Sequence, residues 1–133
     1  NRAGGSVSVR DGTVVARGRN VVTSTFDPTG HAETDTLRAA GRTLRQVDFT
    51  GCILYTTFEP CPMCCGAIMA SGISTLVMGA RHNPTDIRWG LYTVEKLIDL
   101  ARWGDRLKVV TGILPQECLD IRREWEARNA TKK

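Results

Sequence analysis

The sequence lacks the features that would place it in a membrane or among exported proteins. No apolar run approaches the roughly 18 residues that a membrane span needs, and no apolar signal-peptide segment opens the chain. Internal repeats, linkers and low-complexity tracts are also missing. We therefore expect a cytoplasmic protein with no membrane partner.

The chain also has little net charge and little length to spare. Its 133 residues suffice for one domain with a real core but not for two. The 18 Lys and Arg residues exceed the 14 Asp and Glu residues by only four, and they are scattered, which is weak evidence for nucleic-acid binding. We expect a single domain over residues 1–133. The chain does not begin with methionine, so we leave open an N-terminal helix before Asn1.

Histidine is scarce, with two residues, whereas cysteine is present five times. An odd number of cysteines without an export signal favours a reducing environment, where cysteines are more often ligands, nucleophiles or buried side chains than disulfides. We interpret Cys52, Cys65 and Cys118 as packing residues. His82 is interpreted as part of a loop or of a substrate rim.

The first half of the chain predicts a hairpin followed by a helix. Residues 5–10 and 13–19 are β-prone, and the Asp11-Gly12 pair between them is a strong hairpin signal. A polar loop follows over residues 20–30. The helical spacing of Leu37, Ala40, Leu44 and Val47 then predicts a helix from His31 to about Gln46.

The second half alternates strands and helices. The continuous β-prone run 52–58 predicts a strand buried on both faces. We further expect a helix over 63–71, a strand over 75–80, a loop over 82–90, a helix over 94–101, a strand over 107–111 and a last helix over 114–125. This order predicts an α/β fold, with a mixed five-stranded sheet and helices on both faces.

Two motifs carry chemistry, and each stands at the start of a predicted helix. They are His31-Ala32-Glu33 and Pro60-Cys61-Pro62-Met63-Cys64. Cys61 and Cys64 are one helical turn apart, so both sulfur atoms can lie on one side, and a helix N-terminus favours thiolates. With His31 they form a ligand set suited to tetrahedral zinc. Together the motifs predict one Zn²⁺ per chain.

The number of ligands distinguishes a catalytic zinc from a structural one. A structural site takes four protein ligands, whereas His31, Cys61 and Cys64 supply three and leave a position for water. Zinc lowers the pKa of its bound water to about 7, which makes that water a nucleophile. Glu33 lies within reach of such a water and is a suitable proton carrier. The pattern is the signature of zinc-dependent deaminases.

At these residues the sequence resembles the cytidine-deaminase-like superfamily, in its nucleobase and tRNA-adenosine deaminase branch. The resemblance covers nearly the whole chain. It rests on Gly18-Arg19-Asn20, Asp27-Pro28-Thr29, His31-Ala32-Glu33, Leu54-Tyr55-Thr56-Thr57, Glu59-Pro60-Cys61-Pro62-Met63-Cys64 and Gly66-Ala67-Ile68. It implies a three-layer α/β/α sandwich and a homodimer. It also implies that Asn20 binds the substrate base and that the backbone N–H of Ala32 holds a ring atom.

The segment after the fourth predicted strand departs from the tRNA-adenosine pattern. Gly79-Ala80-Arg81 matches it, but His82-Asn83-Pro84-Thr85-Asp86-Ile87-Arg88-Trp89 replaces an acidic residue and a glycine-rich loop. Residues 122–126 form a mixed run rather than a basic cluster. These differences favour a small free base over RNA, with Phe58 and Trp89 in the pocket. For Phe58, a place in the core is the alternative. For Trp89, a place in the dimer core stays equally open.

The sequence therefore predicts a zinc-dependent hydrolase that deaminates a small heteroaromatic base. Guanine, cytosine and amino-azine or triazine analogues are the candidate substrates. A zinc-bound hydroxide attacks the amine-bearing ring carbon, Glu33 shuttles the protons, and ammonia leaves. One alternative is a tRNA wobble-adenosine deaminase that forms inosine. An alternative of another class is a catalytically silent, zinc-stabilised binding module.

Overall fold

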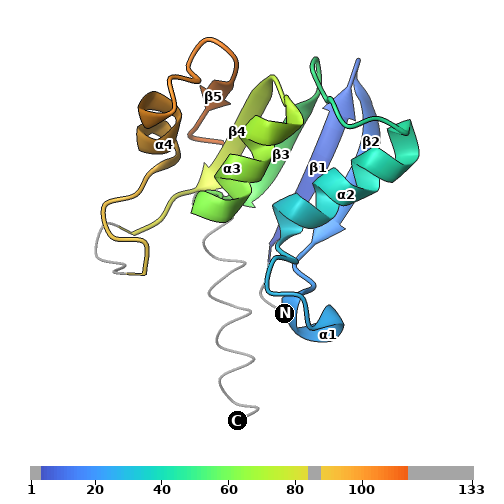
Figure 1. Cartoon of the computed structure of the whole chain (residues 1–133), viewed down its shortest axis with the longest axis horizontal. Coiled ribbons are helices and arrows are strands. Elements are labelled where there is room, and N and C mark those ends of the chain that lie inside the picture. Colours follow the sequence, from blue (N-terminus) through green and yellow to red (C-terminus); the bar gives the residue numbers. More distant parts are fainter. Residues whose placement is uncertain (1–3, 84–87, 114–133) are drawn as a thin grey trace.

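The computed structural model describes residues 4–83 and 88–113, and this part of the chain forms an α/β domain (Figure 1). Most predicted elements are confirmed within a residue or two at their ends. In chain order the elements are β1 (Gly5–Arg10), β2 (Thr13–Arg19), α1 (Val22–Thr25), α2 (Ala32–Leu44), β3 (Ile53–Phe58), α3 (Pro62–Ser71), β4 (Thr75–Ala80), α4 (Val94–Leu100) and β5 (Lys108–Val110). The predicted last helix and Cys118 lie outside the described residues.

The mixed five-stranded sheet is confirmed, with the strand order β2-β1-β3-β4-β5. β1 is antiparallel to β2 and to β3, whereas β3, β4 and β5 run parallel. Asp11 and Gly12 turn the hairpin with φ angles of 51° and 75°, the positive values that a two-residue hairpin loop requires. Parallel β3 and β4 place their carboxyl ends at the same edge of the sheet, where sites in α/β folds form.

The three longer helices pack in a row against one face of the sheet (Figure 1). Leu54, Leu76 and Met78 point to this face and are fully buried. On the opposite face Tyr55 is 42% exposed, so the prediction that the β3 strand is buried on both faces is wrong. The described residues thus supply the sheet and one helical layer of the predicted sandwich.

A glycine in β2 lets α2 lie close to the hairpin. A Cβ atom at Gly18 would stand only 2.3 Å from Oγ1 of Thr36, a distance that real Cβ contacts do not reach. Thr36 is fully buried, and its hydroxyl donates to the carbonyl oxygens of Ala32, at 2.8 Å, and of Ser6, at 3.2 Å. This close packing fixes the first turn of α2 relative to β1.

Two local predictions are wrong. α2 ends at Leu44 rather than near Gln46, because Arg45 adopts the left-handed conformation with φ of 54°, and Val47 is consequently 90% exposed instead of packed. The expected loop 20–30 contains the one-turn helix α1, which ends at Phe26 with φ of 52°. Helix α1 is too short to leave a periodic pattern.

The interior confirms the interpretation of two cysteines as packing residues. Cys52 and Cys65 have no exposed surface and belong to the core cluster. Burial raises the pKa of both thiols, which keeps them protonated and unreactive. Among the described residues, no helix has the length and apolar character needed to cross a membrane.

Candidate metal centre

Helices α2 and α3 each begin with one of the predicted ligands. His31 is the N-cap of α2 and Cys61 is the N-cap of α3, with similar extended backbones of φ −70°, ψ 163° and φ −67°, ψ 171°. Pro62 occupies the first turn of α3, where its missing N–H removes no helical hydrogen bond. Within the described residues, neither N-cap side chain makes a capping hydrogen bond. The two side chains instead approach each other, with Cys61 Sγ in hydrogen-bond contact with the imidazole of His31.

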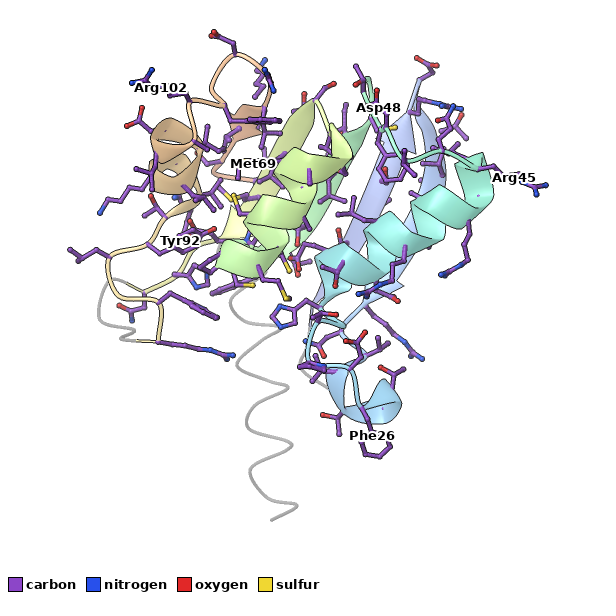
Figure 2. The ribbon with its side chains drawn as sticks, viewed as in Figure 1. Phe26, Arg45, Asp48, Met69, Tyr92 and Arg102 are labelled. Carbon is purple, nitrogen blue, oxygen red and sulfur yellow. The ribbon has the colours of Figure 1, made fainter. Side chains whose placement is uncertain are left out.

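The three predicted ligands lie together. One ligand atom from each of His31, Cys61 and Cys64 falls within 4.8 Å of the others, and sulfur atoms gather where α3 faces the start of α2 (Figure 2). Cys61 Sγ lies 3.5 Å from Nδ1 of His31. Two ligands of tetrahedral zinc, with Zn–S of about 2.3 Å and Zn–N of about 2.05 Å, stand about 3.6 Å apart. The donor set and its spacing fit zinc.

The two thiols of this cluster differ in acidity. A hydrogen bond from the Cys64 thiol lowers the pKa of Cys61 to about 6, helped by the backbone N–H groups of Cys64 and Met63 and by the charge of His31. That same hydrogen bond, with burial and the nearby Glu33 carboxylate, raises the pKa of Cys64 well above its usual range. This asymmetry favours the thiolate at Cys61 in the metal-free chain, and a zinc ion held there would require Cys64 to lose its proton as well.

Glu33 stands beside the cluster in the first turn of α2 and is 8% exposed. Its Oε1 accepts a hydrogen bond of 2.6 Å from Oγ1 of Thr56, a buried residue of β3. The carboxylate also acts on the Cys64 thiol, which shows that it faces the metal ligands. Sequence reasoning assigned no role to Thr56, because 23 residues separate it from Glu33 and only the packing of α2 on β3 joins them.

A second residue that the sequence did not single out is Glu59, which precedes the Pro60-Cys61 pair. It is 3% exposed, and its carboxylate accepts hydrogen bonds from the backbone N–H groups of His82, at 3.0 Å, and Val94, at 2.9 Å. Arg81 pairs with the same carboxylate at 3.1 Å. In the sequence, only the position of Glu59 before a metal-ligand motif could have indicated a role. Its hydrogen-bond donors could not be foreseen, because they come from distant segments.

The predicted substrate residues lie on different elements around this end of the sheet. Asn20 accepts a hydrogen bond of 3.2 Å from the N–H of Val22, so its carbonyl oxygen serves the start of α1. Ala32, the first residue of α2, is buried. Phe58, at the end of β3, meets the His82 ring edge-on, with centroids 5.0 Å apart. Their contacts with a substrate stay predictions.

Trp89 lines a separate cavity of about 150 Å³. The other described residues around it come from the segment between β4 and the start of α4, namely His82, Asn83, Gly90, Leu91, Tyr92, Thr93 and Lys96. His82 stands between the rings of Phe58 and Tyr92. Within the described part of the chain His82 is not in the metal-ligand group, which leaves three protein ligands there.

Three candidate ligands at two helix N-termini, with a buried carboxylate beside them, are the arrangement expected of a metal-dependent hydrolytic site, because a zinc ion held by these three residues would keep a position for water. Comparison with known proteins agrees with this class. Residues 1–80 match the model of the cytidine and deoxycytidylate deaminase zinc-binding region. The chain belongs to this family of zinc-binding deaminases.

Relatives in the family act on different substrates. A guanine deaminase of Bacillus subtilis is 45% identical over 79 residues, which cover 59% of this chain and 51% of that protein. A tRNA-specific adenosine deaminase of Buchnera aphidicola is 36% identical over 117 residues, covering 88% of this chain and 75% of the relative. The structure of a guanine deaminase from Nitrosomonas europaea superposes with a TM-score of 0.79 at 26% identity, covering 93% of this chain and 72% of that one.

The match with the Bacillus guanine deaminase therefore spans about half of that protein. These comparisons establish the shared fold and the membership of the zinc-binding deaminase family. They do not separate a free base from tRNA as the substrate, because relatives of both kinds match.

Proposed function

We propose that this protein is a zinc-dependent hydrolase that removes the exocyclic amine from a small heteroaromatic base, with guanine as the first candidate. His31, Cys61 and Cys64 hold one zinc ion, and Glu33 carries protons. The observation that carries the proposal is the buried Glu33 carboxylate, fixed at 2.6 Å by Thr56 beside a cluster to which the described residues contribute three ligands. A purely structural zinc site would not need such a group.

Zinc, when bound, supplies a water of lowered pKa and stabilises negative charge on its oxygen. The chain's own residues then act on protons. Glu33 accepts one proton of the attacking water and passes it to the ring nitrogen. It then carries the second proton, from the new hydroxyl on the ring carbon, to the departing amine, which leaves as ammonia. Thr56 donates to Oε1 of Glu33 and so keeps one oxygen in place while the other faces the substrate.

A small base is supported by the residues that follow β4. Arg81 pairs with Glu59 and Glu95, at 3.1 Å for the first, so it is engaged within the protein rather than offered to a phosphate. The rings of His82, Phe58 and Tyr92 gather next to this arginine, and Trp89 lines a small cavity of about 150 Å³ beside His82 and Tyr92. The 45% identity with a guanine deaminase agrees with this choice.

The second candidate is a tRNA wobble-adenosine deaminase. The specific observation in its favour is coverage, since the Buchnera tRNA-specific adenosine deaminase aligns with 88% of this chain. Its substrate is a nucleotide in RNA, so it predicts inosine in an anticodon stem-loop and no turnover of free bases. The catalytic roles of Glu33 and the three ligands are the same in both candidates.

One panel of substrates tests the proposal. Zinc-loaded protein is incubated with guanine, cytosine, a triaminotriazine and an adenosine-containing anticodon stem-loop, and ammonia release is measured. Release from a free base with none from the RNA supports the proposal, and the reverse result transfers the function to tRNA. Stoichiometric zinc without turnover of any substrate contradicts both and favours a silent binding module. We also propose a homodimer, which sedimentation equilibrium tests.

A further inference from the structure

The two residues that join β3 to the first cysteine ligand, Glu59 and Pro60, are both held by residues that follow β4 in the chain, namely His82, Tyr92 and Val94. Oε1 of Glu59 accepts from the N–H of His82 at 3.0 Å, and Oε2 accepts from the N–H of Val94 at 2.9 Å. Pro60, the next residue, accepts a hydrogen bond of 2.7 Å from the Tyr92 hydroxyl. Three separate contacts therefore converge on the approach to Cys61.

Arg81 completes the shell around Glu59. Its Nε and one terminal nitrogen donate to the two carboxylate oxygens at 3.2 Å and 3.1 Å. On its other side the same guanidinium pairs with Glu95, whose side chain is 49% exposed, whereas that of Glu59 is 1% exposed. The Glu59 end of this network is buried and the Glu95 end is open to water.

Four donors on two oxygens leave the Glu59 carboxylate little freedom to rotate. The backbone of Glu59 is also fixed, because its N–H donates to the carbonyl oxygen of Ala80 at 2.7 Å. Cys61 follows two residues later, and the extended backbone at that residue sets where Sγ lies. A shift of the 59–60 backbone would thus move this sulfur directly, against a ligand set whose distances are short and specific.

We propose that Glu59 and Tyr92 are positioning residues of the metal centre, which hold Cys61 in its ligating place. We call these two side chains, with Arg81, the Glu59 clamp. Residues outside the ligand set commonly tune metal affinity in this way. The proposal rests on the proposed function only through the zinc site, and not on which substrate is turned over.

The first experiment compares two glutamate variants that meet the same arginine. Zinc affinity is measured by competition with a chromophoric chelator for the wild type, Glu59→Gln and Glu95→Gln. We expect Glu59→Gln to weaken zinc binding by at least ~10-fold, the usual range for a residue that orients a ligand. Glu95→Gln, on the solvent side of Arg81, should change it by less than about fivefold, as for an exposed ion pair.

The second experiment reads the ligand geometry without turnover. Cobalt is substituted for zinc, and the visible and thiolate charge-transfer bands are recorded for the wild type, Glu59→Gln and Tyr92→Phe. We expect shifted bands for both variants, with the smaller shift for Tyr92→Phe, because it loses one hydrogen bond to Pro60. Glu59→Asp keeps the carboxylate. Wild-type bands in this variant, even with a lower melting temperature, would also support a positioning role.

Wild-type zinc affinity and cobalt spectra in Glu59→Gln, together with a lowered melting temperature, would overturn the proposal and leave Glu59 a purely structural residue. If Glu59→Gln does not fold, Tyr92→Phe decides by the same two readouts. Because both measure metal binding, a protein that deaminates no tested base while Glu59→Gln still weakens zinc binding would refute the proposed function and leave the clamp standing.

Discussion

Helices α2 and α3 start alike and continue differently. Each begins with a metal-ligand side chain at its N-cap, in nearly the same backbone conformation. Beyond the first turn, α2 is amphipathic, with Arg38 and Arg42 exposed on its outer face. In α3, by contrast, Cys64, Cys65 and Ile68 have no exposed surface, and the helix lies between α2 and α4. The site is formed by the first turns of the two helices. The exposure of the remaining turns depends on whether the helix lies at the edge or in the middle of the helical layer.

The two starts also divide the chemistry. α2 supplies an imidazole and, two residues on, the Glu33 carboxylate, so it brings a nitrogen ligand and the proton carrier. α3 supplies two thiols near its N-terminus, where free backbone N–H groups favour the thiolate of Cys61. Damage to α3 should therefore affect metal binding first, whereas damage around Glu33 should affect turnover first.

The largest expected effect is a loss of zinc affinity, and it distinguishes two neighbouring cysteines of α3. Cys64→Ala removes a ligand, and we expect zinc affinity to fall by more than the ~100-fold that loss of an outer residue can cost. Cys65→Ala is the matched control, because Cys65 is equally buried but belongs to the core cluster. Zinc content after dialysis measures both, and equal losses from the two variants would contradict the ligand assignment.

The next prediction compares how buried and exposed positions of the two helices contribute to the free energy of unfolding. Ile68→Ala empties a fully buried position on α3, and the free energy of unfolding should fall by about 2–5 kcal/mol. Arg42→Ala on the exposed face of α2 should change it by no more than about 0.5 kcal/mol. Urea denaturation of zinc-loaded protein measures both values. A similar loss for the two variants would show that the outer face of α2 is covered by something else.

A smaller effect is expected at the contact that orients Glu33. Thr56→Val keeps the shape of the side chain but removes the 2.6 Å hydrogen bond, so kcat should fall by about tenfold or more. Zinc content should stay unchanged. Thr56→Ser retains the hydroxyl and should keep most of the activity. Loss of zinc rather than of kcat in Thr56→Val would indicate that this contact serves α3 instead.

The mildest test is the pH dependence of the metal-free chain. The folded pKa of Cys61, at about 6, lies below the unfolded thiol value of about 8.5. The thiolate's contribution to stability is therefore complete above about pH 8.5, declines as the pH falls toward 6, and is absent below that. Chelated wild type and Cys61→Ser are unfolded with urea across this range. A difference in unfolding free energy that does not shrink on acidification would contradict the thiolate assignment.

Local patterns predicted much of this molecule. The hairpin, the helix starts at His31 and Cys61, and the strand 75–80 follow from turn residues, alternation and proline placement, all readable over a few residues. The ligand cluster was predictable because ligand spacing and helix starts put its members at one end of the sheet. The position of Glu33 beside this cluster was predictable because Glu33 lies two residues from a predicted ligand.

Contacts between distant segments were not predictable. Thr56 reaches Glu33, and Glu59 collects donors from His82 and Val94, only because α2 and the segment after β4 pack where they do. No periodicity encodes such pairs. The exposure of Tyr55 was not predicted for a related reason. A continuous β-prone run does not reveal which face of a strand is covered by other elements.

The most direct test of the central claim is Glu33→Ala, assayed for two properties in one preparation. The account predicts that zinc stays at one ion per chain while ammonia release from the best substrate of the panel falls by roughly 10²–10⁴-fold, the usual contribution of a positioned acid–base group. Asp35→Asn, two residues further along α2 and therefore on a different side of the helix, is the control and should retain activity. Appreciable ammonia release by zinc-loaded Glu33→Ala would contradict the account.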